Sequence, residues 1–336
     1  KAIAKVRSEP GVEIVDVPEP TPGPGEVKIK LEAASVCGTD LHIYNWDPWA
    51  AGRIKPPRII GHEFCGTIVE VGEGVTERAV GDFISSESHI VDPESPWMKA
   101  GLGHVDPDTC ILGVDVDGGF AEYAVLPIAS ARPTDRRIPP RIACFQDALG
   151  NAVHTVSDGP VEGKEILITG LGPIGLMAAS VCRAMGAARV IGTEISPYRR
   201  NLAEQVGVDL ILDPTKDDVR SLLKGGVDAT LEMSGHPSSI ELAVDVTREG
   251  GRISLLGVYG NSPLPVDLNK VIFKGLRLQG IVGRRLWETW DLMGKLLSEG
   301  GLDPSPVVTH TFPFTEFQEA MELMKRGEAG KVVFTF

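Results

Sequence analysis

Hydrophobic and polar positions follow one pattern before residue 150 and a different one after it. In the first part, short runs alternate between apolar and polar residues, as at Val27, Ile29 and Leu31, and end in Gly or Pro turns. Alternation of this kind is typical of strands that bury one face. Because few stretches have helical spacing, residues 1–150 are predicted to form an irregular β-rich domain.

Beyond residue 150, continuous apolar runs alternate with segments that have the spacing of amphipathic helices. The predicted strands are 164–170, 188–194, 209–213, 227–235, 251–258 and 275–283, and the clearest predicted helices are 173–187, 198–207 and 240–250. Buried strands that alternate with helices are typical of a parallel, doubly wound α/β sheet. Residues 151–284 are therefore predicted to form a Rossmann domain.

The tail after residue 284 is too short to form a third domain. It contains a predicted helix at 315–327, in which Thr315 and Gln318 have the spacing of a capping box, and it ends in a predicted strand. We expect this tail, residues 285–336, to pack against one of the two domains.

Composition narrows the possible classes of function. The 336 residues include 33 Lys and Arg against 46 Asp and Glu, a net charge of −13, which argues against binding nucleic acid or an anionic membrane through net charge. No apolar run approaches the ~20 residues needed to span a bilayer. The five cysteines are odd in number and lack C-x-x-C spacing, so we expect free thiols and a cytoplasmic location.

A glycine-rich turn connects the first strand and the first helix of the second domain. The turn consists of Gly170, Leu171, Gly172, Pro173, Ile174 and Gly175, in G-x-G-x-x-G spacing. Between a strand and a helix, such glycines let the backbone approach a pyrophosphate, which the helix N-terminus attracts. A glycine turn in an unliganded α/β protein is the alternative, but the strand and helix around this turn favour dinucleotide binding.

Three charged side chains bear on the choice of cofactor. Glu194 ends the next strand, where a carboxylate can bind the ribose hydroxyls and would repel a 2′-phosphate. Arg199 lies close by in sequence and complicates this, since arginine is the residue that NADP sites use. Arg284 is expected at the end of the last strand of this domain, where it could pair with the pyrophosphate. On balance the sequence favours NAD.

The first domain contains a possible metal constellation. Cys37 is followed 25 residues later by the pair His62 and Glu63. Zinc binds thiolate and imidazole readily, and a catalytic zinc keeps a position for water or substrate. Taken alone, however, His62 could be a satisfied polar residue in a turn and Glu63 a surface charge.

These motifs together resemble a known family. The pattern G-H-E-x-x-G-x5-G-x-x-V is met by Gly61, His62, Glu63, Gly66, Gly72 and Val75, after C-G-T-D-L-H at 37–42 and before the Rossmann unit. The chain is similar, over nearly its whole length, to the zinc-dependent medium-chain alcohol dehydrogenases. Stretches such as LGNAVHT and LWETW resemble the branch of that family that oxidises L-threonine.

The resemblance implies a set of metal ligands and one metal ion. It makes Cys37, His62 and Asp147 the ligands of one catalytic zinc, with Glu63 as a fourth ligand that exchanges with water or substrate. A carboxylate at Asp147 is unremarkable on its own, so its role depends on the resemblance.

The resemblance also implies roles in catalysis. Thr39 and His42 would pass the substrate proton to solvent, and His89 lies where the threonine-oxidising enzymes have a histidine that influences substrate choice. The alternatives are a turn-capping hydroxyl for Thr39 and ordinary polar positions for the two histidines.

The family fold implies a domain plan. A GroES-like domain over 1–150 would carry zinc, 151–284 would carry NAD, and 285–336 would return to the first domain. Family analogy further suggests a homotetramer.

The chain departs from many members of the family in the segment after His89. Where those members have four cysteines for a structural zinc, this chain has Asp92, Ser95, Met98 and Asp106. One unaligned thiol, Cys110, cannot form the closed thiolate site that a structural zinc needs, so we predict no structural zinc. Binding of a hard cation by the acidic residues 92–108 is a weaker alternative than a solvated acidic loop.

The function expected from the resemblance is zinc-assisted hydride transfer from the C3 hydroxyl of L-threonine to NAD⁺, which gives L-2-amino-3-oxobutanoate. A polyol or vicinal diol dehydrogenase of the same family is the alternative. A non-catalytic NAD-binding protein on the same fold is a third hypothesis, against which the intact zinc and relay motifs argue.

Overall fold

The computed structural model describes residues 1–260, 263–299 and 301–336. The chain divides into two compact units. The first comprises 1–148, 285–294 and 308–336, and the second comprises 149–284 and 295–307. Residues 295–307, which we expected with the first domain, lie in the second unit because the 3₁₀ turn η3 (Ser305–Val307) contacts the unit's helices α6 and α7.

The first unit is β-rich. Its strands are β1 (Ala2–Lys5), β2 (Glu13–Val15), β3 (Glu26–Val36), β4 (Arg58–Ile59), β5 (Glu63–Val71), β6 (Phe83–Ser86), β7 (His89–Ile90), β8 (Cys110–Ile111), β9 (Tyr123–Pro127), β10 (Ala131–Pro133), β17 (Val308–Pro313) and β18 (Lys331–Thr335). The helices wholly inside it are α1 (Gly38–Asn45), α2 (Pro48–Arg53), α3 (Pro96–Lys99), α4 (Pro140–Ala143) and α12 (Phe317–Lys325). Two longer helices, α5 (Gln146–Ser157) and α11 (Glu288–Ser298), belong partly to each unit.

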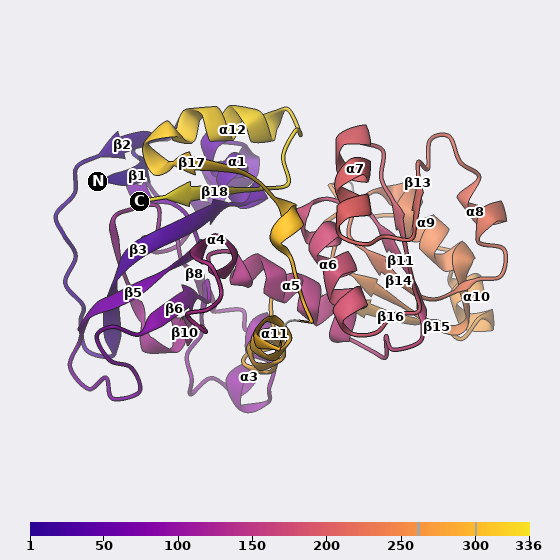
Figure 1. Ribbon diagram of the computed structural model, residues 1–336, viewed down its shortest axis with the longest axis horizontal. Coiled ribbons are helices and arrows are strands. Elements are labelled where there is room, and N and C mark those ends of the chain that lie inside the picture. The colour runs from indigo at the N-terminus through magenta and orange to yellow at the C-terminus, as the bar shows by residue number, and fades with distance from the viewer. Residues whose placement is uncertain (261–262, 300) are drawn as a thin grey trace. The chain divides into compact units, whose positions relative to one another are not determined.

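The tail of the chain completes the main sheet of the first unit. The sheet has the order β10-β6-β5-β3-β18-β17, with β9 also paired to β3. Strand β18 pairs antiparallel with β3, and α12 lies beside β17 and β18 (Figure 1). The fold is therefore closed by residues from both ends of the sequence.

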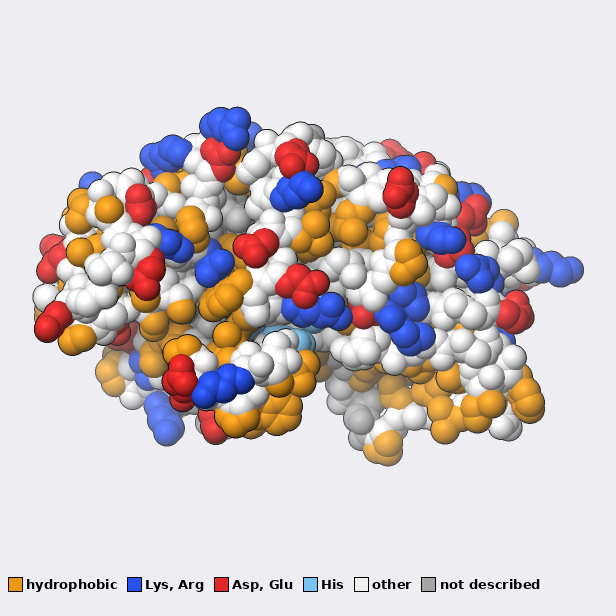
Figure 2. Space-filling model, turned by 90° about the horizontal axis from the view of Figure 1, so that it is seen from below, with side chains coloured by type: hydrophobic (Ala, Val, Ile, Leu, Met, Phe, Trp, Pro, Cys, Tyr) orange, Lys and Arg blue, Asp and Glu red, His pale blue; other side chains and the backbone are white. Residues whose placement is uncertain are grey.

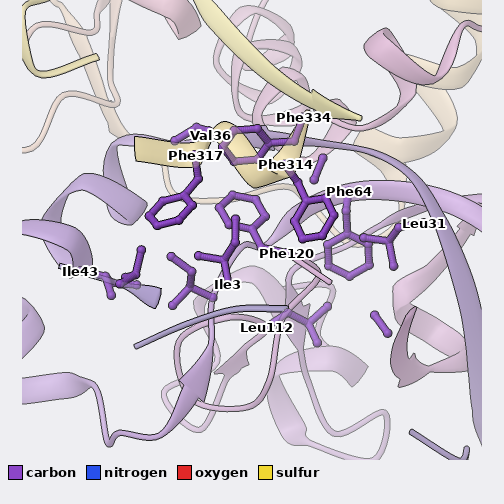
Figure 3. Close-up of a cluster of buried hydrophobic side chains, with 14 of the residues drawn as sticks. Ile3, Leu31, Val36, Ile43, Phe64, Leu112, Phe120, Phe314, Phe317 and Phe334 are labelled. Atoms are coloured by element: carbon purple, nitrogen blue, oxygen red, sulfur yellow. The ribbon is translucent and has the colours of Figure 1, made fainter. Parts of the chain in front are cut away.

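Aromatic side chains from distant segments fill the core of this unit. Phe64 and Phe120 are fully buried, and the ring of Phe120 meets Phe334 of β18 edge-on at 5.2 Å (Figure 3). Phe314 and Phe317 join the same cluster from the tail. Burial of these rings stabilises the attachment of the tail, since each large apolar side chain contributes about 1.5–3 kcal/mol when fully buried.

The second unit is a doubly wound parallel sheet. Its strands are β11 (Glu165–Thr169), β12 (Arg189–Thr193), β13 (Leu210–Leu212), β14 (Val227–Glu232), β15 (Thr247–Leu255) and β16 (Arg277–Gly280), in the order β13-β12-β11-β14-β15-β16. Its helices are α6 (Pro173–Ala184), α7 (Pro197–Gln205), α8 (Val219–Leu222), α9 (Pro237–Val246) and α10 (Leu268–Phe273). The order, which reverses between β11 and β14, is that of dinucleotide-binding folds. Helices α6 and α7 pack over β11–β13, and α9 packs with α10 over β14 and β15 (Figure 1).

Two element boundaries differ from the prediction. The helix predicted at 240–250 ends at Val246, because Thr247 already pairs with Val227 of β14 and shares a hydroxyl hydrogen bond of 2.7 Å with Thr230. The tail helix begins at Phe317, and its N-cap is Glu316. The 3₁₀ turn over Phe314–Glu316 places Thr315 ahead of the helix, so the predicted capping box does not form.

Among the described residues, no helix is long and apolar enough to cross a membrane.

Candidate metal centre and cofactor-binding turn

Strand register brings the first metal candidates together. Ser35 of β3 lies opposite Glu63 of β5 in the antiparallel pair. Cys37 follows β3 directly and His62 precedes β5, so both come to the same end of the sheet. One potential ligand atom from each of Cys37, His62 and Glu63 lies within 4.8 Å of the other two. Among the described residues, this is the one group of three or more such side chains that could hold a metal ion.

A glycine fixes the entry to this site. Gly61 has φ +89, and a Cβ there would lie 2.1 Å from the ring of Phe120. Both facts demand glycine immediately before His62. On the other side, the Ser86 hydroxyl donates to the carbonyl of His62 at 2.9 Å and accepts the N–H of Phe64 at 3.1 Å. The backbone that carries His62 is therefore held from both sides.

The donor atoms of the site fit a metal ion. His62 Nδ1 and Glu63 Oε1 are buried atoms without a hydrogen-bond partner. Buried polar atoms are rarely left in this state unless water, a ligand or an ion completes them. Thiolate, imidazole and carboxylate are the ligand types of catalytic zinc. The three side chains therefore match what a zinc ion requires.

The charges around His62 reinforce one another. Burial alone would lower the pKa of the imidazole, but the charges of Cys37, Asp40 and Glu63 outweigh it and raise the pKa to about 10. Burial also raises the pKa of the Asp40 carboxyl, against the charge of His62. The raised pKa favours the protonated imidazole, so a metal ion must compete with a proton for His62.

Asp147 stands apart from the three-residue group. It is the second residue of α5 and is buried, and its Oδ1 accepts the backbone N–H of Ser88 at 2.8 Å. The aspartate is therefore anchored to the segment that carries His89. Its role as a metal ligand stays a prediction.

The predicted relay residues share one short helix. Thr39 lies in the first turn of α1, with its hydroxyl 3.9 Å from Cys37 Sγ. His42 lies one turn later on the exposed surface, where Nδ1 pairs with a carboxylate oxygen of Asp47. The helix therefore leads from the thiol toward solvent, as a proton path requires. Its end is held by an aspartate that the sequence argument did not identify.

The glycine turn has the geometry that close packing demands. Gly170 has φ +85, and a Cβ at Gly175 would lie 2.1 Å from the carbonyl oxygen of Gly170. Gly172 is the N-cap of α6, and Pro173 and Ile174 are its first helical residues. The proline suits a first turn because its missing N–H has no partner there in any case. The remaining N–H groups of that turn can face an anion.

Glu194 and Arg199 both approach this turn. The Glu194 carboxylate accepts the N–H of Leu171 at 3.0 Å and that of Ser196 at 2.9 Å. Arg199 Nη1 lies 4.0 Å from Glu194 and 4.0 Å from where a Cβ on Gly172 would be. Arg284 lies four residues beyond the end of β16, not at the end of the strand as we expected, and its side chain is buried.

Comparison with known proteins agrees with this geometry. Residues 23–135 match the family of alcohol dehydrogenase GroES-like domains, and residues 173–299 match the family of zinc-binding dehydrogenases. The L-threonine 3-dehydrogenase of Pyrococcus furiosus is 48% identical over 340 residues, which cover 99% of this chain and 97% of the relative. The L-threonine 3-dehydrogenase of Bacillus subtilis is 44% identical over 339 residues, with the same coverage.

The chain belongs to the zinc-binding alcohol dehydrogenase family. Within it, the full-length relatives place the chain among the L-threonine 3-dehydrogenases. The fold and the family that the sequence predicted are thereby confirmed.

Solved structures of other dehydrogenases share the fold. A short chain alcohol dehydrogenase (rspB) from Escherichia coli, complexed with NADH, has a TM-score of 0.91 and 28% identity over 100% of this chain and 98% of that one. A zinc-binding dehydrogenase from Sinorhizobium meliloti bound to NADP has a TM-score of 0.89 and 26% identity, with full coverage of both chains. The fold therefore accepts either cofactor.

One residue that contacts the candidate metal ligands was not predicted from the sequence. Lys331 begins β18, and because Val332 pairs with Val36, the lysine lies beside Cys37. Its ammonium pairs with Glu63 and donates to the carbonyl of Val36 at 3.3 Å. Burial would lower the pKa of Lys331, but the charges of Glu63 and Cys37 raise it. A lysine 268 residues from Glu63 in sequence gives no local signal of this contact.

The segment for which we predicted no structural zinc forms a small lobe. The lobe runs from β7 to β8 and contains α3 and the 3₁₀ turn η1 (Gly103–Val105). Ser95 caps α3 by accepting the N–H of Met98 at 3.1 Å, and Met98 packs against Gly103. Asp92 and Asp106 accept the N–H groups of Glu94 and Asp108 at 2.8 and 2.9 Å. Turn hydrogen bonds and packing therefore involve the four positions, Asp92, Ser95, Met98 and Asp106, at which we expected cysteines from the family resemblance.

Proposed function

We propose that this dehydrogenase oxidises the C3 hydroxyl of L-threonine with NAD⁺, giving L-2-amino-3-oxobutanoate, NADH and a proton. The observation that carries the proposal is the group of Cys37, His62 and Glu63, in which the half-buried thiol lies beside two buried side chains whose atoms His62 Nδ1 and Glu63 Oε1 have no hydrogen-bond partner. The choice of L-threonine as substrate is based on the full-length relatives that are named L-threonine 3-dehydrogenase.

Cys37, His62 and Asp147 would hold one zinc ion, with Glu63 as an exchangeable fourth ligand. When bound, zinc supplies Lewis acidity that lowers the pKa of a hydroxyl group beside it. Asp147 would join them from the first turn of α5, where its Oδ1 accepts the N–H of Ser88.

The chain's own residues move the proton. Thr39 would receive it at its hydroxyl and His42 would release it to solvent, since a histidine exchanges protons readily near neutral pH. Asp47 fixes the imidazole of His42 from the Nδ1 side. His89 would contact the polar end of the substrate.

NAD is the cofactor that this site favours. The Glu194 carboxylate at the glycine turn would repel a 2′-phosphate, and Arg199 is within 4.0 Å of it and partly balances that charge. We infer that the repulsion of a 2′-phosphate by Glu194 outweighs the attraction by Arg199. Glu194 is buried, and two backbone N–H groups fix its carboxylate at the turn.

Comparison of kcat/KM for L-threonine, sorbitol and 2,3-butanediol with NAD⁺ tests the substrate. L-threonine should exceed both others by at least about tenfold, because neither of them carries an ammonium or carboxylate group for the site to recognise. A preference for 2,3-butanediol or sorbitol would instead establish the diol or polyol alternative. The same assay with NADP⁺ tests the cofactor.

A further inference from the structure

A carboxylate that the proposed mechanism does not use lies beside His89. Glu87 sits between β6 and β7 with its side chain fully buried. Its backbone N–H donates to the carbonyl of Ser130 at 2.8 Å, which fixes the main chain at that point. A buried carboxylate is unfavourable unless its oxygens accept hydrogen bonds or meet a positive charge. The hydrogen-bond donors and positive charges around the Glu87 carboxylate therefore indicate its role.

Each oxygen of Glu87 has a definite neighbour. Oε1 accepts the backbone N–H of His89 at 2.8 Å and lies 3.5 Å from Nδ1 of the same histidine. Oε2 accepts the indole N–H of Trp290, in α11, at 2.6 Å. The carboxylate therefore connects the candidate substrate histidine to a tryptophan 203 residues away.

An arginine supplies positive charge to the same group. The guanidinium of Arg132 lies 4.1 Å from the ring centre of Trp287 and 6.0 Å from that of Trp290. At these distances a guanidinium is attracted to the ring faces. Its charge also interacts with Glu87 and Asp291. We call Glu87, His89, Arg132 and Trp290 the Glu87 cluster.

We propose that Glu87 is a positioning residue for specificity: held by the indole N–H of Trp290, it turns Nδ1 of His89 toward itself and so presents Nε2 to the ammonium group of a 2-amino-3-hydroxy acid. The tautomer that donates from Nδ1 to a carboxylate carries its lone pair on Nε2, which can accept a hydrogen bond from an ammonium. This inference rests on the proposed function, which places His89 at the substrate. The proposal also assigns a role to the LWETW segment, because the second tryptophan of that segment is Trp290.

Two variants and a matched control test the proposal. Trp290→Phe keeps the aromatic ring and removes only the N–H, whereas Glu87→Gln keeps the size of the side chain and removes the charge. Trp97→Phe makes the same change of side chain at a tryptophan that is 41% exposed in the lobe. Steady-state kinetics with L-threonine and 2,3-butanediol would be measured for the zinc-loaded enzyme, together with zinc content and the ¹⁵N spectrum of the His89 imidazole.

The proposal predicts a loss specific to the amino acid. In both cluster variants KM for L-threonine should rise about tenfold with kcat nearly constant, since a displaced contact weakens binding of the group that it recognises. kcat/KM for 2,3-butanediol, zinc content and the Trp97→Phe variant should stay unchanged. The ¹⁵N spectrum of Glu87→Gln should show a shifted balance of the two His89 tautomers.

Two results would overturn the proposal. One is equal loss on both substrates, which would make the cluster merely structural, and the other is an unaltered His89 spectrum in Glu87→Gln. If the unmodified enzyme oxidised 2,3-butanediol but not L-threonine, the proposed function would fail. The spectrum would still decide whether Glu87 orients His89.

Discussion

At the scale of single residues, the partners of Glu63 explain how a carboxylate can be buried beside a thiol. The hydroxyl of Ser35 donates to it from the facing strand, and the ammonium of Lys331 pairs with it from β18. Both Glu63 and Lys331 are almost fully buried. Removing one member of such a pair leaves an uncompensated buried charge, which is far more unfavourable than removing both.

Lys331→Met should therefore destabilise the metal-free protein. We expect the free energy of unfolding to fall by about 3 kcal/mol or more, measured by urea denaturation in the presence of a chelator. The double variant Lys331→Met with Glu63→Gln should recover a large part of the loss, because the buried charge is then gone. Strictly additive effects of the two substitutions would show that the pair does not interact.

His42 and Asp47 should matter for turnover and not for metal binding. His42→Ala should lower kcat by about 100-fold and leave zinc content near normal, because the imidazole lies at the solvent end of α1. Loss of zinc in this variant would instead identify His42 as a ligand.

Asp47→Asn is the finer test of the same relay. The N–H of Ala50 lowers the pKa of Asp47, and the pairing with His42 lowers it further. Asparagine can still accept that N–H and keep α2 capped, so the variant changes only the contact with His42. We expect a smaller fall in kcat than in His42→Ala, with the thermal midpoint unchanged. An unaltered kcat would exclude Asp47 from the relay.

Sites whose residues lie close together in the sequence could be predicted. Contacts between residues that only strand pairing brings together could not. In the Gly170–Gly175 turn and in the pair His62–Glu63, the residues that indicate a binding site are neighbours in the sequence. By contrast, Lys331 reaches Glu63 only through the register of β18 on β3, and Trp290 reaches Glu87 only through the return of the tail. No periodicity or local spacing encodes such a register.

At the scale of elements, the lobe between β7 and β8 shows how a loop can hold together without thiolates. Its short helix α3 is capped by Ser95, and its turns are fixed by the carboxylates of Asp92 and Asp106. Each such turn hydrogen bond adds about 0.5–1.5 kcal/mol. The acidic residues thus have backbone partners that account for their presence.

Metal analysis of the purified protein should give one zinc per chain. Cys37→Ala should lower that value toward zero, because it removes a ligand of the candidate site. Cys110→Ser, which changes the exposed thiol in the lobe, should leave it at one and serves as the control. Two zinc ions per chain would contradict the prediction that the lobe lacks a structural metal.

Element types were easier to predict than element ends. All six strands of the parallel sheet lie within the predicted segments except for the start of β15, where cross-strand pairing of Thr247 prevailed over a helical pattern. The start of α12 was misplaced by two residues because a 3₁₀ turn leads into it. In both places a tertiary or turn contact outweighed the local pattern.

At the scale of the whole molecule, acidic residues outnumber basic ones and the net charge is −13. Figure 2 shows acidic and basic side chains side by side on one face. A negative net charge disfavours binding to a phosphate backbone, which is itself negative.

The exposed edge of the parallel sheet supports self-association. Strand β16 ends the sheet order, and Ile272 and Phe273, which precede it in α10, are 69% and 85% exposed. An unpaired edge beside exposed apolar side chains is typical of an interface. We predict a homotetramer that uses this surface.

Light scattering after size exclusion should give the mass of four chains. Phe273→Asp should yield a smaller species, because a charge would be buried at the interface, whereas Leu222→Asp, at a residue 58% exposed on α8, should leave the mass unchanged. A wild-type protein that runs as a single chain at micromolar concentration would contradict this prediction.

The formation of NADH from NAD⁺ and L-threonine tests the central claim most directly. The absorbance of NADH would be followed with purified protein, then after removal of metal by a chelator, and again after zinc is restored. We predict steady formation of NADH, its loss with the chelator and its return with zinc, since Cys37, His62 and Glu63 form the only group of potential metal ligands of this kind among the described residues. Absence of NADH formation by the zinc-loaded protein, or full activity in the chelated protein, would contradict this prediction.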